Sequence, residues 1–296
     1  MLHGNRRAVK LLENYVKKGG SQNLLLKGPK GVGKYTAARM IACKLLKCED
    51  NKLDCNPDAM IISKEDAIKV EDIKAIIEFC SIKALYASRK IIIIDNCETM
   101  NELAQNKLLK TLEESGNNIF ILISSAPLLE TITSRTIDVP FTRISDCEME
   151  EYFQERNETP EIPFELLDGS IGMYEFLKSD KEFFEDIKEL VHVITNMKEK
   201  KEFLSAFHVL KEKDEKEFFS KHKSKIPAVI SFLQKIYLQA FLVKKGLLYQ
   251  YRYNLVNLYD QEEILSICAM LGEHLTKCVK PSYSKIDFAQ LVYSLN

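Results

Sequence analysis

The first 142 residues alternate between two patterns of hydrophobic and polar positions. Short apolar-rich runs bounded by polar residues are typical of strands buried in a parallel sheet, and they occur at 23–27, 90–95, 118–124 and 137–141. Apolar residues at three- and four-residue spacing are typical of amphipathic helices, and they occur at 6–18, 33–47, 71–81 and 101–114. This alternation predicts a parallel sheet assembled from βαβ units.

The expected helix at 101–114 follows a residue that is suited to cap it. Asn101 can accept a hydrogen bond from a free backbone N–H of the first helical turn. The apolar positions that we expect to face inward are Leu103, Ala104, Leu108, Leu109 and Leu112.

Beyond Thr142 the strand signal ends. We predict three domains: an α/β domain at 1–142, a small helical domain of two or three short helices at 143–180, and an all-α domain of long helices at 181–296. The stretch 198–225 is crowded with charges of both signs. Mixed signs favour a solvated helical face there over a nucleic-acid patch.

Composition and charge narrow the function classes. The chain has 296 residues, of which 46% are hydrophobic and 29% charged, and these are the proportions of an ordinary globular protein. Its 42 basic and 43 acidic residues leave a net charge of -1. No overall basic field therefore attracts nucleic acid, and any DNA contact must be local and shared with partners.

The sequence predicts no membrane partner. Its uninterrupted apolar runs, such as Ile91–Ile94 and Ile119–Ile123, are far shorter than the roughly 20 residues of a membrane-spanning helix. The first twelve residues lack the apolar segment of a signal peptide. The eight cysteines have no small-scaffold spacing, so we expect reduced thiols and a cytoplasmic location.

A glycine-rich loop connects the first expected strand to the following helix. Gly28, Gly31, Gly33 and Lys34 lie in the sequence GPKGVGK, which fits the phosphate-binding pattern G-x-x-x-x-G-K. Glycines let successive backbone N–H groups turn toward a phosphate, and the helix N-terminus adds partial positive charge. Lys34 would reach the β- and γ-phosphates, so we expect a nucleotide-binding type of fold. Retained binding of nucleotide is a separate question.

Two positions near this loop lack the residues that hydrolysis requires. Serine or threonine normally follows the lysine and binds magnesium, but this chain has Tyr35, and Thr36 is rotated by about 100° around the helix. Asp95 would hold the magnesium shell, but the water-polarising glutamate expected next is replaced by Asn96. We expect Glu98, two residues further on, to turn away from the site.

Several runs in the first 142 residues together resemble one family. The runs are LLLKGPKGVGKYTAARMIACKLLKC, IKVEDIKAIIEFCSIKALYASRKIIIIDNCETM and AQNKLLKTLEESGNNIFILISS, followed by Ser134-Arg135 and Val139-Pro140-Phe141. They look like bacterial DNA polymerase III clamp-loader subunits of the AAA+ class, and among these most like the delta-prime subunits. The resemblance is dense over 1–142, weaker over the next 40 residues, and rests on helical character and length beyond 181.

The resemblance implies an architecture, partners and a site. The architecture is an α/β AAA+ P-loop domain, a small helical lid and a helical collar. The partners are delta and tau/gamma subunits in a ring that opens the sliding clamp and places it on primed DNA. In this family the arginine of a Ser-Arg-Cys motif enters the neighbour's ATP site. The matching residue is Arg135, with Thr136 in place of the cysteine, and Ser124 or Ser125 fills the phosphate-sensing position.

Two further features of the family are missing from this sequence. The lid normally presents an arginine to the nucleotide, but the matching stretch at 169–174 contains none. The family often holds zinc through four cysteines after the first P-loop helix, and this chain keeps only Cys48 and Cys55. Two thiolates do not complete a tetrahedral site. We therefore expect no structural zinc and assign no metal ligand.

Three functions remain to be weighed. The favoured one is a delta-prime-like clamp-loader subunit that hydrolyses no ATP, keeps a weak or vestigial site for ATP or ADP, and offers Arg135 to a neighbour. The alternative is an active tau/gamma-like motor ATPase in which Lys34, Asp95 and Ser125 suffice. A small-molecule kinase would need a lid with arginines, and 143–180 has only Arg143 and Arg156. Polymerase activity would belong to the assembled DNA polymerase III holoenzyme, because no paired-aspartate pattern of a polymerase site is found.

Overall fold

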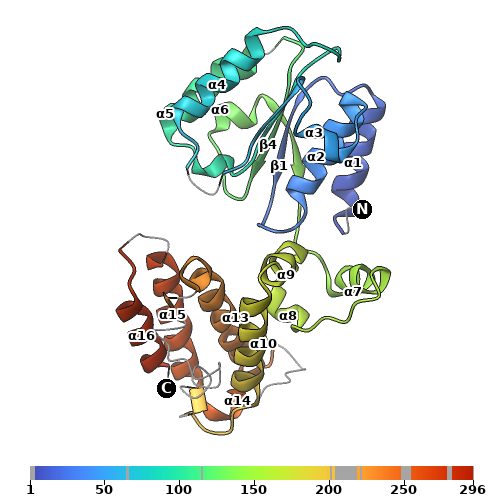
Figure 1. Ribbon diagram of the computed structural model, residues 1–296. Coiled ribbons are helices and arrows are strands. Elements are labelled where there is room, and N and C mark those ends of the chain that lie inside the picture. The colour runs from blue at the N-terminus through green and yellow to red at the C-terminus, as the bar shows by residue number, and fades with distance from the viewer. Residues whose placement is uncertain are drawn as a thin grey trace. The chain divides into compact units, whose positions relative to one another are not determined.

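The computed structural model of the chain describes residues 4–64, 67–114, 116–200, 202–203, 219–220, 222–247, 255–278 and 282–295 (Figure 1). It divides into two compact units. The first comprises Met1–Glu158 and Asp168–Met173, and the second comprises Thr159–Leu167 and Tyr174–Asn296. The three-domain division at 142 and 180 stays a prediction.

A parallel sheet of five strands forms the centre of the first unit. The strands are β1 (Asn23–Lys27), β2 (Ala59–Ile62), β3 (Ile91–Ile94), β4 (Ile119–Ser124) and β5 (Thr136–Pro140). Their order is β2-β3-β4-β1-β5, and every neighbouring pair is parallel. The predicted parallel α/β sheet is therefore confirmed. The short edge strand β2, which is only half-buried, was not predicted.

Helices cover both faces of this sheet (Figure 1). One face packs on α1 (Arg6–Lys17), α2 (Lys34–Leu46) and α3 (Asp50–Leu53), and the other packs on α4 (Val70–Ser81), α5 (Glu102–Glu113) and α6 (Glu130–Thr133). Leu24 and Leu26 of β1 face the first group, whereas Leu25 faces the second. Because both faces are covered, the central strands are apolar throughout rather than alternating.

One position of α5 departs from the prediction. The Asn101 side chain caps the helix by accepting the N–H of Ala104 at 2.9 Å, as expected. Ala104, Leu108 and Leu112 are buried, but Leu103 is 72% exposed. The buried positions recur every four residues, and Leu103 lies about 100° around the helix from Ala104. Its inward orientation was therefore predicted wrongly.

Among the described residues after β5, the regular elements are all helices. Residues 143–180 contain three short helices, as predicted: α7 (Asp146–Glu155), α8 (Phe164–Leu167) and α9 (Ile171–Lys178). The longer stretch contains α10 (Lys181–Asn196), α13 (Ile226–Lys244), α14 (Leu255–Leu258), α15 (Gln261–Lys277) and α16 (Lys285–Ser294). Most of the mixed-charge stretch 198–225 lies outside the described residues.

Helix α13 supplies much of the core of the second unit. Nine of its 19 residues are buried, and it packs against α15. Within the described part of the chain it is the one helix long and apolar enough to cross a membrane, but half of its apolar window is buried inside the fold. A core helix of a globular unit has the same properties, so this is weak evidence for a span.

Candidate phosphate-loop site

The glycine loop follows β1 at the carboxyl edge of the sheet and leads into α2. Gly28, Gly31 and Gly33 all have positive φ angles, of 149°, 74° and 91°, which glycine adopts without steric cost. A Cβ at Gly28 would lie 2.1 Å from the Phe141 carbonyl oxygen, and one at Gly31 would lie 2.0 Å from Ser170 Oγ. Glycine is therefore required here by close approach as well as by conformation.

The Lys34 ammonium is directed back into its own loop. Its Nζ lies 2.6 Å from the carbonyl oxygen of Gly28, 2.5 Å from that of Pro29 and 3.3 Å from Ser125 Oγ. The residue is 5% exposed. Burial lowers the pKa of Lys34 below its ordinary value, although the carboxylates of Glu98 and Asp95 favour the charged form. A bound phosphate would replace the loop carbonyl oxygens as the acceptor of the Lys34 ammonium hydrogen bonds.

The stretch that the sequence assigns to the lid touches the loop through its backbone. The N–H of Gly172 donates to the carbonyl oxygen of Gly31 at 2.9 Å. A Cβ at Gly172 would lie 2.7 Å from Gly31 Cα. Contact this close needs glycine on both sides, and no sequence pattern indicated it.

Tyr35 and Thr36 make no described contact with the Lys34 ammonium or the glycine loop. The Tyr35 ring packs against the α1–α2 side of the core and lies 5.9 Å from the guanidinium carbon of Arg39, one turn along the same helix. Thr36 is exposed. Among the described hydrogen bonds, neither hydroxyl binds Asp95. The residues needed to seat a magnesium ion between the loop and β3 are therefore not gathered.

Asp95 and Asn96 are held by the segment that follows β2. The Asp95 carboxylate accepts its neighbour's N–H at 2.9 Å and the Ser63 hydroxyl at 3.2 Å. Asn96 has a left-handed backbone, with φ of 55°, and its side-chain amide donates to the Lys64 carbonyl oxygen at 3.1 Å. The Asn96 carboxamide is thus bonded to the segment that follows β2, and not to Lys34.

Glu98 was expected to turn away, and it does the opposite. Its Oε2 accepts the N–H of Ser125 at 3.1 Å and lies 3.2 Å from Ser124 Oγ. Its Oε1 is buried and has no hydrogen-bond partner among the described residues. The cause is a 3-10 turn at Cys97–Thr99, anchored by the fully buried Cys97. This turn directs the side chain at 98 toward the end of β4.

Arg135 lies at the opposite edge of the sheet from the loop. It directly precedes β5, whose first residue, Thr136, pairs with Asn23 at the start of β1. The loop begins after Lys27, four strand residues or about 13 Å further along. The guanidinium pairs with Glu113 at the end of α5, donates to the Thr131 carbonyl oxygen at 2.7 Å, and remains partly exposed.

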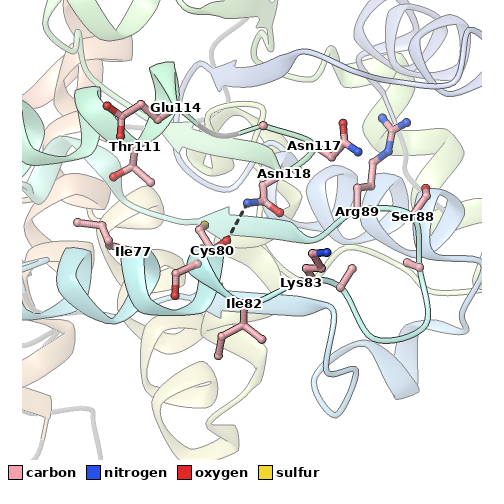
Figure 2. A pocket seen from close by; sticks show the side chains of 14 residues that line it. Ile77, Cys80, Ile82, Lys83, Ser88, Arg89, Thr111, Glu114, Asn117 and Asn118 are labelled. Atoms are coloured by element: carbon pink, nitrogen blue, oxygen red, sulfur yellow. Dashed lines mark hydrogen bonds between the residues drawn. The ribbon is translucent and has the colours of Figure 1, made fainter.

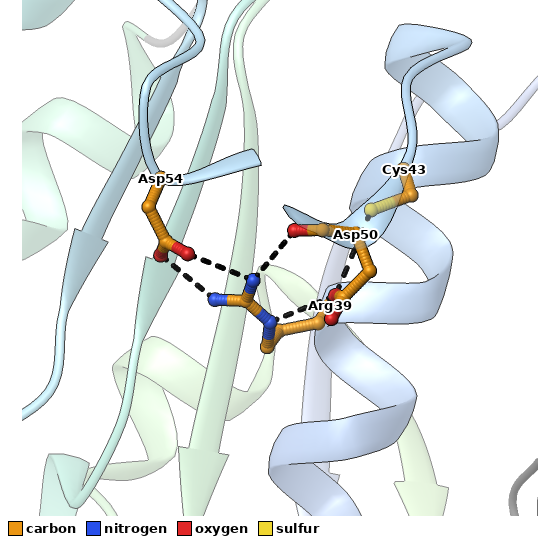
Figure 3. Close-up of polar contacts among 4 residues, drawn as sticks. All are labelled: Arg39, Cys43, Asp50 and Asp54. Carbon is orange, nitrogen blue, oxygen red and sulfur yellow. Dashed lines mark hydrogen bonds and ion pairs between the residues drawn. The ribbon is translucent and has the colours of Figure 1, made fainter. Parts of the chain in front are cut away.

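The predicted absence of structural zinc can be compared with the residues after α2. Cys48 is half-buried and Cys55 is exposed, and the described residues contain no cluster of histidine, cysteine or acidic side chains able to hold a metal. Instead the Arg39 guanidinium joins α2 to the next segment (Figure 3). It binds both Asp54 carboxylate oxygens at 2.8 and 2.9 Å, and the Asp50 carboxylate and carbonyl oxygen at 2.8 Å each. The absence of structural zinc stays a prediction.

We expect Arg39→Met to destabilise the first unit by about 1–2 kcal/mol. Methionine keeps most of the stem, but the hydrogen bonds to Asp50 and Asp54 are lost, and the exposure of both acids limits the effect. Urea unfolding of the variant and the wild type measures the change. EDTA should leave the unfolding midpoint of the wild type unchanged, because Arg39 rather than a metal fastens this segment. A chelator-induced loss of stability would contradict that assignment.

A hollow of about 640 Å³ lies away from the phosphate loop. It is bounded by the ends of α4 and α5 and by the loop before β3, at the amino edge of the sheet (Figure 2). The Asn118 amide donates across it to the Cys80 carbonyl oxygen at 3.4 Å. None of the sequence-predicted site residues lines it.

Comparison with known proteins shows which proteins this part of the chain resembles. Residues 4–145 match the family model described as DNA polymerase III, delta subunit. Subunit delta' of DNA polymerase III from Pseudomonas aeruginosa is 34% identical over 133 residues, or 38% of this chain and 40% of the relative. Its counterpart from Bacillus subtilis is 30% identical over 174 residues, or 53% of each chain. Over these residues, the chain is similar to the delta-prime subunits of DNA polymerase III.

The extent of the likeness differs between sequence and fold. By sequence, the chain spans about half the length of the curated relatives it matches. By fold, a DNA polymerase III gamma subunit-related protein from Thermotoga maritima matches 97% of this chain, with a TM-score of 0.54 and 18% identity. That similarity shows a shared fold, in which an α/β unit is followed by a helical C-terminal part. The roles of the individual site residues stay predictions.

Proposed function

We propose that the chain is a delta-prime-type clamp-loader subunit in DNA replication that hydrolyses no ATP and donates Arg135 to the ATP site of a neighbouring subunit. Its partners are then delta and tau/gamma subunits, the sliding clamp, and primed DNA reached through the assembled complex. The observation that carries the proposal is the position of Arg135. It is partly exposed and lies at the far edge of the sheet from this chain's own Lys34, so it is suited to serve another chain.

The surroundings of Lys34 support the non-hydrolysing half of the proposal. Hydrolysis by a P-loop protein needs a magnesium ligand next to the lysine and a group that orients water. Tyr35 lies against Arg39, and the Asn96 amide is bonded to the Lys64 carbonyl oxygen. Such catalytic parts act as a unit, and the loss of one alone commonly costs orders of magnitude in rate.

An active motor ATPase is the second candidate, because Lys34 and Ser125 do meet, and Asp95 and Glu98 lie within electrostatic reach of Lys34. Steady-state phosphate release by the isolated chain separates the two functions. We expect no magnesium-dependent turnover above that of Lys34→Ala. Turnover that vanishes in Lys34→Ala would establish the motor and contradict the non-hydrolysing proposal.

A further inference from the structure

The end of β3 brings an acid to the phosphate loop from an unexpected position. Cys97 Sγ donates to the Ile94 carbonyl oxygen at 3.1 Å, and Thr99 Oγ1 donates to that of Asn96 at 2.8 Å. These two contacts fix the 3-10 turn from both sides. The side chain at 98, rather than the one at 96, therefore meets the end of β4.

At the end of β4, Glu98 accepts a hydrogen bond from Ser125, a residue that also contacts Lys34. The Ser125 N–H points to Glu98 Oε2 at 3.1 Å, while the Ser125 hydroxyl lies 3.3 Å from Lys34 Nζ. In a P-loop protein the lysine marks the place of the β- and γ-phosphates. Ser125 thus contacts both the Lys34 ammonium and the Glu98 carboxylate. The second oxygen of that carboxylate, Oε1, is buried and has no hydrogen-bond partner among the described residues.

This arrangement treats the phosphates of a nucleotide unequally. The glycine loop, Lys34 and the first turn of α2 remain to receive the phosphates nearest the nucleoside. A terminal third phosphate would bring further negative charge against Glu98 and Asp95. A magnesium ion normally offsets such repulsion, and Tyr35 replaces the hydroxyl that would help to hold it.

We propose that Glu98 makes the loop discriminate against a third phosphate, so that the site takes a nucleoside diphosphate in preference to a triphosphate. The inference deepens the proposed function and rests on it, since it names the nucleotide class for a loop that binds without hydrolysing. Glu98 acts by charge and by retaining the Ser125 N–H. It forms and breaks no covalent bond.

Calorimetric titration of the full chain with ADP and with ATP, in magnesium-free buffer, tests this role. We expect ADP to bind about tenfold or more tightly than ATP, because like charges within a few ångströms in a partly buried site repel strongly. Glu98→Gln keeps the size of the side chain and an acceptor for the Ser125 N–H but removes the charge. It should bring the two dissociation constants to within about threefold, mainly by tightening ATP.

The matched control is Glu102→Gln, which removes the same charge from an exposed position at the start of α5. It should leave the ADP-to-ATP ratio of the wild type unchanged, and thermal unfolding should show that both variants are folded. Equal binding of the two nucleotides by the wild type, or an unchanged ratio in Glu98→Gln, overturns the inference. Absence of binding of both nucleotides in both proteins overturns it too. None of these results bears on Arg135, which lies at the other edge of the sheet and is tested separately.

Discussion

Arg135→Ala is expected to reduce ATP hydrolysis at the neighbouring subunit's site by about 10³-fold in a complex reconstituted with delta and tau/gamma subunits. A guanidinium supplied in trans neutralises charge that develops on the transferring phosphoryl group, and such arginines contribute factors of this order or more. The measurement is phosphate release by the complex in the presence of clamp and primed DNA. Size-exclusion chromatography should show that the variant still assembles.

The existing contacts of Arg135 are compatible with this role. Its partner Glu113 and the guanidinium are both partly exposed, with side-chain exposures of 49% and 35%. Exposed ion pairs of this kind contribute about 0–1 kcal/mol. Exchanging the carboxylate for a phosphate therefore costs the subunit little, while the backbone N–H of Arg135, bonded to the Ile132 carbonyl oxygen at 3.0 Å, keeps the residue in place.

Two control variants make the Arg135 result specific. Arg6→Ala removes an arginine that forms an exposed ion pair with Glu151 elsewhere on the first unit, and it should leave hydrolysis unchanged. Arg135→Lys keeps the charge but loses the planar fork of donors, so it should restore only part of the rate. Normal hydrolysis by assembled Arg135→Ala complexes would show that Arg135 is not a trans-acting arginine.

The fold could be predicted where local sequence decides it. Runs such as Ile91–Ile94 and Ile119–Ser124 are apolar on both faces, which only a doubly covered strand explains, and their bounds were predicted to within a residue or two. β2 was missed although Ala59–Ile62 are all apolar, because so short an apolar run does not distinguish a strand from part of a helix. The exposure of Leu103 was missed because the sequence does not distinguish an apolar residue beside the buried face of a helix from one within it.

The site was predictable only in part. The glycine loop and Lys34 form a motif in which consecutive residues fix the backbone, so the sequence alone locates it. The contact of Glu98 with Ser125 joins residues 27 positions apart and depends on a 3-10 turn that has no strong sequence signal. The packing of Gly172 against Gly31 likewise depends on the tertiary fold. Such long-range contacts follow from the packing of elements, which periodicity does not report.

Asp58→Ala is expected to lower the free energy of unfolding of the first unit by about 3–5 kcal/mol. Asp58 is 1% exposed, and its carboxylate accepts three backbone N–H groups of the loop before β3: Leu85 at 2.6 Å, and Tyr86 and Ala87 at 2.7 Å each. Alanine would leave all three donors without their acceptor, and hydrogen bonds to a charged group are among the stronger ones. Urea unfolding at pH 7 measures the loss, and Glu150→Ala, an exposed acid on α7, should change stability by less than about 0.5 kcal/mol.

The same carboxylate predicts how the stability depends on pH. Burial alone would raise the pKa of Asp58, but the N–H groups of Leu85, Ala87 and Tyr86, together with the charge of Lys90, bring its pKa below the ordinary value. A carboxylate whose pKa is lower in the folded state contributes its full stabilisation at pH values above its unfolded-state pKa of about 3.9. That contribution is lost as the pH falls through the folded-state pKa. Because the carboxamide of an Asp58→Asn variant cannot ionise, the stability difference between the wild type and this variant should be constant from pH 7 to pH 5 and shrink below about pH 4. A difference that stays constant at lower pH would mean that the charge on Asp58 contributes nothing to holding the loop.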